Sequence, residues 1–140
     1  MTAQFPVAVH ALVFLLHKGE LTSSEKLAAN ICTNPARVRK VMAMLCRAGL
    51  AGCRQGKSSG YFPRPDGECI TLRAVMEALS ERPLSMSWSS GDEKQACPIC
   101  SGMGREMDRL YDELNEDCLR SLEKVTIGSI SADLFQEGKV

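Results

Sequence analysis

Residues 33–47 decide the fold, and they read Thr33-Asn34-Pro35-Ala36-Arg37-Val38-Arg39-Lys40-Val41-Met42-Ala43-Met44-Leu45-Cys46-Arg47. Asn34 and Pro35 predict a helix start, because asparagine caps helix N-termini and proline suits the first helical position. The helix is expected to run to about Ala48, where Gly49 stops it. The face of the helix opposite its apolar residues carries arginine and lysine interleaved with alanine. The short alanine side chains allow close approach, and the cations can reach the phosphates and base edges of a polyanion. The apolar residues recur at helical spacing: Val38, Val41, Met42, Leu45 and Cys46.

Two further helices are predicted upstream of this one. Residues 5–18 are apolar almost all round, so a helix there should lie deep in the core, and Gly19 should end it. Thr22 and Glu25 have the spacing of a capping box, which predicts a short helix over residues 23–31. About three residues separate that helix from the quoted one, which is the spacing of a helix-turn-helix.

A β-hairpin is predicted directly after the helix-turn-helix. Two strand-like segments, 50–54 and 61–64, flank a glycine-bounded basic loop over residues 55–60. A hairpin in this position is a wing, and wings lie along the phosphate backbone or enter the minor groove of DNA. A further short helix over residues 70–79 should complete the domain. The cations expected on the wing are Arg54, Lys57 and Arg64.

Charge is divided unevenly along the 140 residues, although the formal net charge is zero. Residues 1–68 hold nine Lys/Arg and four Asp/Glu, a net charge of +5. The remaining residues hold eight Lys/Arg and thirteen Asp/Glu, a net charge of −5. A basic first half joined to an acidic second half indicates a polyanion-binding module with an appendage. The composition, 44% hydrophobic and 24% charged, is globular, and only 5% aromatic residues argues against a surface built on stacked bases.

The second half is expected to hold a loop, a long helix and a tail. The loop is rich in Ser, Gly and Pro, and it contains Cys97-Pro98-Ile99-Cys100. The long helix carries one apolar stripe, and a second copy of the chain is the economical partner for it. The stripe consists of Met107, Leu110, Leu114, Cys118, Leu122 and Val125. The predicted organisation is therefore a winged helix-turn-helix domain over 1–80, a cysteine-containing sensor loop over 81–104, a dimerisation helix over 105–125 and a loosely held tail over 126–140.

The seven cysteines are expected to be thiols rather than a disulfide framework. The apolar run over residues 5–16 has no basic leader and is too short to span a bilayer, so a cytoplasmic protein without a membrane partner is expected. Cys46 and Cys118 fall on apolar faces and are interpreted as packing residues. Cys32 lies in the turn before a helix N-terminus beside basic residues, a setting that favours the thiolate.

Several stretches together resemble the IscR/NsrR/CymR family of small bacterial transcription regulators. The resemblance covers residues 5–135 and is carried by residues 8–12, 33–42 and 45–50, and by the wing followed by 70–72. It implies a dimeric winged helix-turn-helix protein whose long helix crosses to its partner. It also implies that the loop before that helix approaches the DNA-binding region of the other subunit. Cluster-binding members carry three cysteines within this loop, whereas this chain has two there and the next one inside the long helix.

The expected function is a homodimeric transcriptional regulator, most simply a repressor of a double-stranded DNA operator, whose binding is controlled by cysteine oxidation. Cys32 would be oxidised first and the partner's Cys97 would resolve it. A local disulfide between Cys97 and Cys100 is the other pairing that stays open. No cofactor is required in this interpretation. The expected DNA contacts are Ser23, Ser24, Thr33, Asn34, Pro35, Arg37, Arg39, Lys40, Arg54, Lys57, Ser58, Ser59 and Tyr61.

Three alternatives stay open beside this interpretation. The same dimer could be controlled by a metal or an iron–sulfur cluster bound through Cys97, Cys100 and Cys118. The helix-turn-helix could serve protein contacts only. A dithiol enzyme is the third, but the thioredoxin-like motif belongs after a strand in a βαβ unit, which this sequence does not predict. The chain is therefore not expected to be an enzyme.

Overall fold

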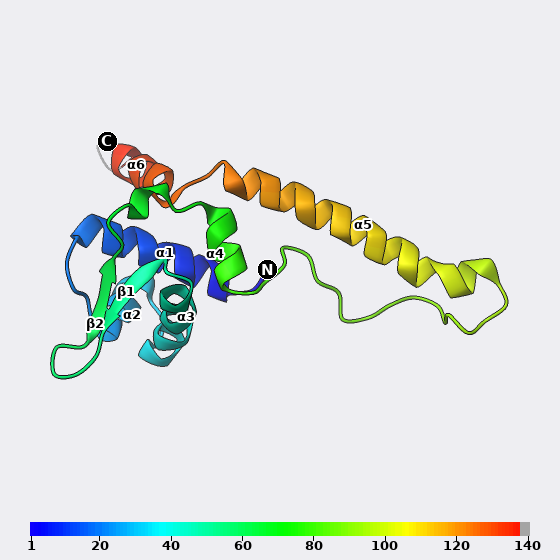
Figure 1. Ribbon diagram of the computed structural model, residues 1–140, viewed down its shortest axis with the longest axis horizontal. Coiled ribbons are helices and arrows are strands. Elements are labelled where there is room, and N and C mark those ends of the chain that lie inside the picture. The colour runs from blue at the N-terminus through cyan, green and yellow to red at the C-terminus, as the bar shows by residue number, and fades with distance from the viewer. Residues whose placement is uncertain (138–140) are drawn as a thin grey trace.

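The chain forms a helical body and a long helical arm that projects from it (Figure 1). This computed structural model describes residues 1–137. The expected fold class is confirmed, since the chain is mainly helical, with one antiparallel hairpin and one long helix. In chain order the elements are α1 (Gln4–Lys18), α2 (Ser24–Ile31), α3 (Pro35–Arg47), β1 (Ala51–Arg54), β2 (Gly60–Pro63), the 3-10 helix η1 (Gly67–Cys69), α4 (Leu72–Ala78), α5 (Pro98–Glu123) and α6 (Ile127–Glu137).

Helix α1 lies at the centre of the body, as its apolar character predicts. Ala8, Ala11 and Leu15 have no exposed surface. The small alanine side chains let neighbouring helices approach closely, and α1 contacts α2, α3, α4, α6 and strand β2. This central helix therefore fixes the positions of the helix-turn-helix and the hairpin relative to each other.

Helix α2 begins one residue later than the capping-box spacing predicts. Ser23, not Thr22, is the N-cap, and its hydroxyl accepts a hydrogen bond from the Lys26 N–H at 3.2 Å. Thr22 is buried and exchanges two backbone hydrogen bonds of 2.8 Å with Tyr61 of β2. Because this bridge to the hairpin holds Thr22 in an extended conformation, tertiary pairing overrides the local capping signal.

Helix α3 begins and ends where the sequence predicts. The side-chain oxygen of Asn34 accepts from the Arg37 N–H at 2.8 Å, and Pro35 is the first helical residue. The helix ends at Arg47, with Ala48 as its C-cap. Its apolar face is buried without exposed surface at Val38, Val41, Met42 and Leu45. The cationic face is consequently directed away from the body.

The two strands form the predicted hairpin. Ala51 pairs with Pro63 and Arg54 with Gly60, and the loop over residues 55–59 is exposed. β1 packs against α3, so the hairpin stands beside the cationic helix. The wing is therefore held both by α3 and by the backbone bridge at Thr22.

Helix α5 is longer than the sequence predicts. Its expected start was near Gly104, but it begins at Pro98, with Cys97 as the N-cap. Glycine lowers helix propensity, which is why the sequence indicates a loop here. Gly104 instead lets the segment before α5 pack closely against the helix, since a Cβ at Gly104 would lie 2.6 Å from the Ser89 hydroxyl oxygen. The predicted loop over 81–104 is thus shortened, and both of its cysteines lie at the start of the helix.

The segment between α4 and α5 follows the arm as a strap, defined here as residues 80–96. Asn115 of α5 is buried and clamps it, because its side chain accepts from the Leu84 N–H at 2.7 Å and donates to the Leu84 carbonyl at 2.9 Å. The N-terminal ammonium of Met1 donates to the carbonyls of Arg82 and Pro83 at 2.8 and 2.9 Å. The strap is therefore attached to α5 and to the start of the chain.

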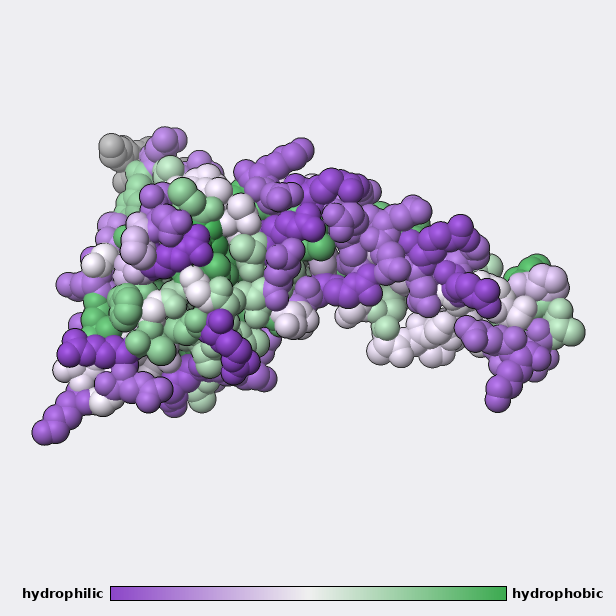
Figure 2. Space-filling view, in the orientation of Figure 1, coloured by the Kyte–Doolittle hydropathy of each residue, from purple (hydrophilic) through white to green (hydrophobic). Residues whose placement is uncertain are grey.

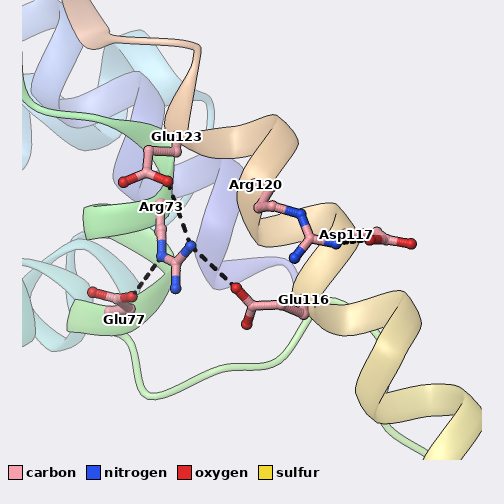
Figure 3. Close-up of polar contacts among 6 residues, drawn as sticks. All are labelled: Arg73, Glu77, Glu116, Asp117, Arg120 and Glu123. Carbon is pink, nitrogen blue, oxygen red and sulfur yellow. Dashed lines mark hydrogen bonds and ion pairs between the residues drawn. The ribbon is translucent and has the colours of Figure 1, made fainter.

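An ion-pair cluster attaches the arm to the body (Figure 3). Arg73 of α4 contacts Glu77 of its own helix at 3.0 Å. It also contacts Glu116 and Glu123 of α5, both at 3.5 Å. Since the two glutamates lie seven residues apart on one side of α5, a single guanidinium holds two turns of the arm.

The apolar stripe predicted along the long helix is divided in the structure. Leu122 and Val125 pack against the core of their own chain instead of facing a partner. Val125 follows the helix, and its carbonyl accepts from the Leu72 N–H at 2.9 Å. Leu110 and Leu114 remain 43% and 39% exposed. Only the stripe beyond the ion-pair cluster is therefore free for another molecule.

The predicted loose tail is wrong for the residues that the structure describes. Residues 127–137 form helix α6, which packs against α1 and η1. Ile127 has no exposed surface, and its N–H donates to the Ile70 carbonyl at 2.8 Å. The cause is the bridge between Thr71 and Thr126, which returns the chain from the arm to the body. Residues 138–140 of the predicted tail lie outside the described residues.

Hydrophilic residues cover most of the arm, whereas the body shows hydrophobic residues among hydrophilic ones, and further hydrophobic residues lie at the free end of the arm (Figure 2). Near that end Trp88 of the strap is 76% exposed and Ile99 of α5 is 71% exposed. Among the described residues, no helix combines the length and the apolar character needed to cross a membrane.

Candidate nucleic-acid interface

Two free cations mark the start of α3. Arg37 and Lys40 are exposed on its outward face, with the short side chain of Ala36 beside them. Within residues 1–137 neither cation forms an ion pair with a carboxylate, so both charges are available to phosphate or base edges. Residues 2–4 border the same shallow depression. The sequence pattern did not indicate this contribution of the N-terminus, because it arises from a contact between segments distant in sequence.

Arg39, the third cation of this face, is oriented by α2. Its guanidinium donates to the Ser24 hydroxyl at 3.3 Å and lies 3.7 Å from the Glu25 carboxylate. Because Ser24 is buried, its position suits orienting Arg39 better than contacting DNA directly. The two helices of the motif are thus joined by side chains as well as by the turn.

A cleft of about 250 Å³ separates α3 from the wing. Arg39 and Ala43 line it from α3, and Arg54, Ser59 and Tyr61 line it from the wing. Burial raises the pKa of Tyr61 above its ordinary value, so its phenol is a protonated donor at neutral pH. Gln55 also lines the cleft. It was missed from the sequence because a lone glutamine in a loop carries no distinguishing pattern.

The remaining predicted wing residues divide into free and paired groups. Lys57 and Ser58 are exposed in the loop. Arg64 is not a free cation, since it lies 2.7 Å from the Asp66 carboxylate and donates to the Gly49 carbonyl at 3.4 Å. The expectation that Arg64 adds to the positive charge of the wing is therefore wrong. Its partner is two residues away, where the chain turns into η1.

Four predicted contact residues lie at the helix starts. Ser23 and Asn34 use their side-chain oxygens as N-caps of α2 and α3. Thr33 is half-buried in the turn between the helices, and Pro35, also half-buried, is the first residue of α3. These residues set the direction of α3, and their arrangement is compatible with backbone contacts to a phosphate at the helix N-terminus.

The cysteine pair at the start of α5 has the geometry of an activated thiol and a neighbour. Cys97 is exposed at the N-cap, and Cys100 is half-buried one turn further on. Cys97 makes no side-chain capping hydrogen bond, but the nearby backbone N–H groups of Cys100 and Ile99 lower the pKa of its thiol. A thiolate at this position is the nucleophile that cysteine oxidation requires.

Cys32 does not have the environment that the sequence suggested. It caps the C-terminus of α2 in the left-handed conformation, with φ of 63°. Its sulfur lies 3.8 Å from the Ala29 carbonyl oxygen and 4.0 Å from that of Asn30. The Cys32 sulfur therefore lies against carbonyl oxygens at the end of α2.

A second thiol pair lies between α3 and the wing. Cys46 of α3 and Cys53 of β1 line the same cleft. Burial, with the neighbouring Cys53 as a smaller cause, raises the pKa of Cys46 to about 12. Cys46 is therefore a protonated packing residue at neutral pH, in agreement with its interpretation from the sequence.

Alkylation should distinguish these thiols. Iodoacetamide at pH 7 is expected to modify Cys97 well before Cys46, because only the thiolate reacts. A lowered pKa keeps the Cys97 thiolate populated below pH 9.0, the ordinary pKa of a thiol, whereas Cys46 stays protonated through pH 9. Peptide mass mapping after short exposures between pH 6 and 9 measures both rates.

The Cys100→Ser variant keeps the two backbone N–H groups near Cys97 and should leave the pH profile of Cys97 alkylation unchanged. An ordinary thiol profile at Cys97 would contradict the assigned geometry.

The fold and this cationic face define a winged helix-turn-helix DNA-binding protein. The family model described as "Rrf2: Iron-dependent Transcriptional regulator" matches residues 1–133. The chain belongs to the Rrf2 family and is a DNA-binding transcriptional regulator of that family. The resemblance noted from the sequence is thereby confirmed.

Individual relatives agree with this assignment. The chain is 25% identical over 123 residues to YwnA of Bacillus subtilis (strain 168), described as an HTH-type transcriptional regulator, covering 88% of this chain and 87% of YwnA. Its fold is similar to a transcriptional regulator from Lactobacillus plantarum, with a TM-score of 0.83, 22% identity and coverage of 99% and 93%. It is also similar to T. potens IscR, with a TM-score of 0.69, 15% identity and coverage of 96% and 87%. The first two of these relatives are described as transcriptional regulators.

The donor set of one chain does not fit the iron–sulfur cluster considered from the sequence. Such a cluster takes four protein ligands, mostly thiolates. Cys97 and Cys100 lie together, but Cys118 is five turns further along α5, or about 27 Å at 1.5 Å per residue. Within the described residues no three His, Cys, Asp or Glu side chains are grouped as metal ligands. The alternative set of Cys97, Cys100 and Cys118 is therefore wrong for a single chain.

Proposed function

We propose that the protein is a homodimeric repressor whose two α3 helices enter the major groove at the half-sites of a two-fold symmetric operator. The carrying observation is that Arg37 and Lys40 of α3 and Arg54 and Lys57 of the wing are free of carboxylate partners among residues 1–137. Base contacts belong to α3, and phosphate contacts belong to the wing. Residues 1–80 with α6 form the DNA-binding body, and the free part of the stripe on residues 105–125 joins the two copies.

We further propose that the pair Cys97–Cys100 controls operator binding. A peroxide supplies the oxidant. The Cys97 thiolate attacks one peroxide oxygen, an S–O bond forms as the O–O bond breaks, and hydroxide leaves. The Cys100 thiol then attacks the Cys97 sulfur, an S–S bond replaces the S–O bond, and the hydroxyl leaves with the Cys100 proton as water. Two thiols are oxidised and one peroxide is reduced.

The new bond would change the first turn of α5. Side chains three residues apart in a helix have Cβ atoms about 5–6 Å apart, whereas a disulfide needs about 3.5–4.5 Å. The Cys100 carbonyl accepts from the Asp92 N–H of the strap at 2.9 Å. A Cβ at Gly91 would lie 2.0 Å from that carbonyl oxygen, so the strap backbone already packs directly against the first turn of α5 there. Tightening the turn should therefore displace the strap, which is hydrogen-bonded to the N-terminus beside α3.

Operator binding before and after hydrogen peroxide treatment tests the switch. The parent is expected to lose affinity on oxidation and to regain it with a dithiol reductant. Cys97→Ser and Cys100→Ser should bind the operator in both conditions, and Cys69→Ser, which removes an exposed cysteine elsewhere, should respond like the parent. Fluorescence anisotropy gives the affinity, and non-reducing peptide mapping identifies the bond.

The mapped bond also separates the two pairings. A monomeric Cys97–Cys100 disulfide supports the local switch. A covalent dimer that disappears in Cys32→Ser would overturn it in favour of a bond between Cys32 and the partner's Cys97, the pairing expected from the sequence. Unchanged operator binding after complete oxidation would refute redox control by either pair while leaving the DNA-binding role intact.

A further inference from the structure

An apolar groove with a cavity volume of about 700 Å³ lies between α1 and α6. Its floor reaches the core at Phe5, Val13 and Leu72, which are buried. One wall is formed by α6, where Leu134 and Phe135 are 55% and 48% exposed. Small-molecule sites typically have volumes of about 300–1,000 Å³ and apolar linings with a few polar groups. The size and lining of this groove are those of such a site.

Aromatic contacts hold the rim of the groove in place. The His17 ring stacks on Phe135 with ring centroids 4.3 Å apart, which links α1 to α6. The Lys18 ammonium lies 5.6 Å from the centroid of the Phe14 ring. Stacked rings and a cation over a ring favour a defined rim over a loose surface.

The polar groups of the groove are donors and cations. His10 Nε2 lies 2.7 Å from the Asn30 side-chain oxygen, which leaves the Asn30 amide hydrogens as donors. Lys18 and Asn30 line both the groove and an adjoining depression that also contains Glu20 and Lys26. No aspartate or glutamate among the described residues lines the groove itself. An apolar cavity with a cation and amide donors at its opening is complementary to an amphipathic anion.

We propose that this groove binds an amphipathic monocarboxylate, such as a medium-chain fatty acid or an aromatic carboxylic acid. The apolar part lies between Val13 and Leu134, and the carboxylate lies at Lys18 and Asn30. Asn30 belongs to the last turn of α2, so the ligand contacts the first helix of the helix-turn-helix directly. The site requires neither the cysteines nor DNA, and it is separate from the cationic face of α3 and the wing.

Calorimetric titration of the full, reduced chain without DNA tests the site, with decanoate and 1-decanol as probes. Decanoate is expected to bind one molecule per chain and more tightly than decanol. Leu134→Trp, which fills the groove from a half-exposed position, should weaken decanoate binding at least ~10-fold, whereas Leu134→Met should retain it. Circular dichroism confirms that each variant is folded.

A charge variant makes the test independent of groove filling. Lys18→Gln should weaken decanoate about 3–5-fold, the effect of one exposed ion pair, and leave decanol unchanged. Lys94→Gln removes an equal charge from the strap and should change neither titration. The proposal is overturned if decanoate binds no better than decanol or if Leu134→Trp binds as the parent does. It is also overturned if Leu134→Trp alters the sedimentation coefficient, because the groove would then be an interface between copies.

Discussion

Leu114→Glu is expected to convert the proposed dimer to monomers and to lower operator affinity by roughly 10²–10⁴-fold. Leu114 is 39% exposed on α5, beyond the part of the stripe that packs on its own body. In a two-fold seam the substitution introduces a pair of carboxylates, and an uncompensated buried charge costs about 3–5 kcal/mol. A monomer binds one half-site at a time, so the linked second contact is lost. Sedimentation velocity and anisotropy with the full operator measure the two effects.

A matched variant distinguishes disruption of the proposed dimer seam from the effect of adding a negative charge to α5. Arg105→Glu places a new carboxylate on the opposite side of α5, since nine residues at 100° each end half a turn away. It should remain dimeric and bind the operator. A stable dimer of Leu114→Glu would show that the two copies meet elsewhere, while DNA binding by the body would be unaffected by that result.

Arg37→Ala is expected to lower operator affinity by about 1–3 kcal/mol, or roughly 5–150-fold, and to relax the preference for the operator over other sequences. Arg37 lies near the start of α3, and no carboxylate among residues 1–137 is paired with it. A bidentate contact to a base edge distinguishes sequences, whereas a phosphate contact does not. Anisotropy titrations with the operator and a scrambled duplex give the ratio.

Two wing variants complete this comparison. Lys57→Ala should weaken binding to both duplexes equally and reduce the salt slope by about 1, because it removes one phosphate contact. Arg64→Ala should change neither quantity, since Arg64 is already paired with Asp66. If Arg37→Ala and Lys57→Ala both bind as the parent does, the DNA face lies elsewhere on the molecule.

Local signals in the sequence were sufficient where each element depends on its own residues. Asn34 and Pro35 set the start of α3, and the apolar spacing from Val38 to Leu45 gave its buried face. Gly19 ends α1 in the left-handed conformation that glycine adopts without strain. The hairpin follows from its glycine-bounded loop. These features depend on hydrogen bonds and side-chain spacing within a few residues.

Prediction failed where a distant segment supplies the deciding contact. Thr22 has a capping pattern, but its backbone pairs with Tyr61. Gly104 reads as a loop residue, but Ser89 of the strap packs against it within a helix. The tail reads as loose, but Ile127 is buried in the body. In each case the local preference amounts to about 1 kcal/mol, which a buried contact or a pair of backbone hydrogen bonds exceeds.

The sequence by itself determined the winged helix-turn-helix, the cations of α3 and the family, because periodicity, caps and charge are properties of contiguous residues. Only the tertiary structure decided which of those groups are free to act. It paired Arg64 with Asp66, directed the Cys32 sulfur at carbonyl oxygens and placed Cys97 at the N-terminus of α5. The reactivity of a side chain depends on the dipoles and charges within a few ångströms of it. In these three cases the groups belong to residues two or three positions away, and only the folded backbone sets how they face the side chain.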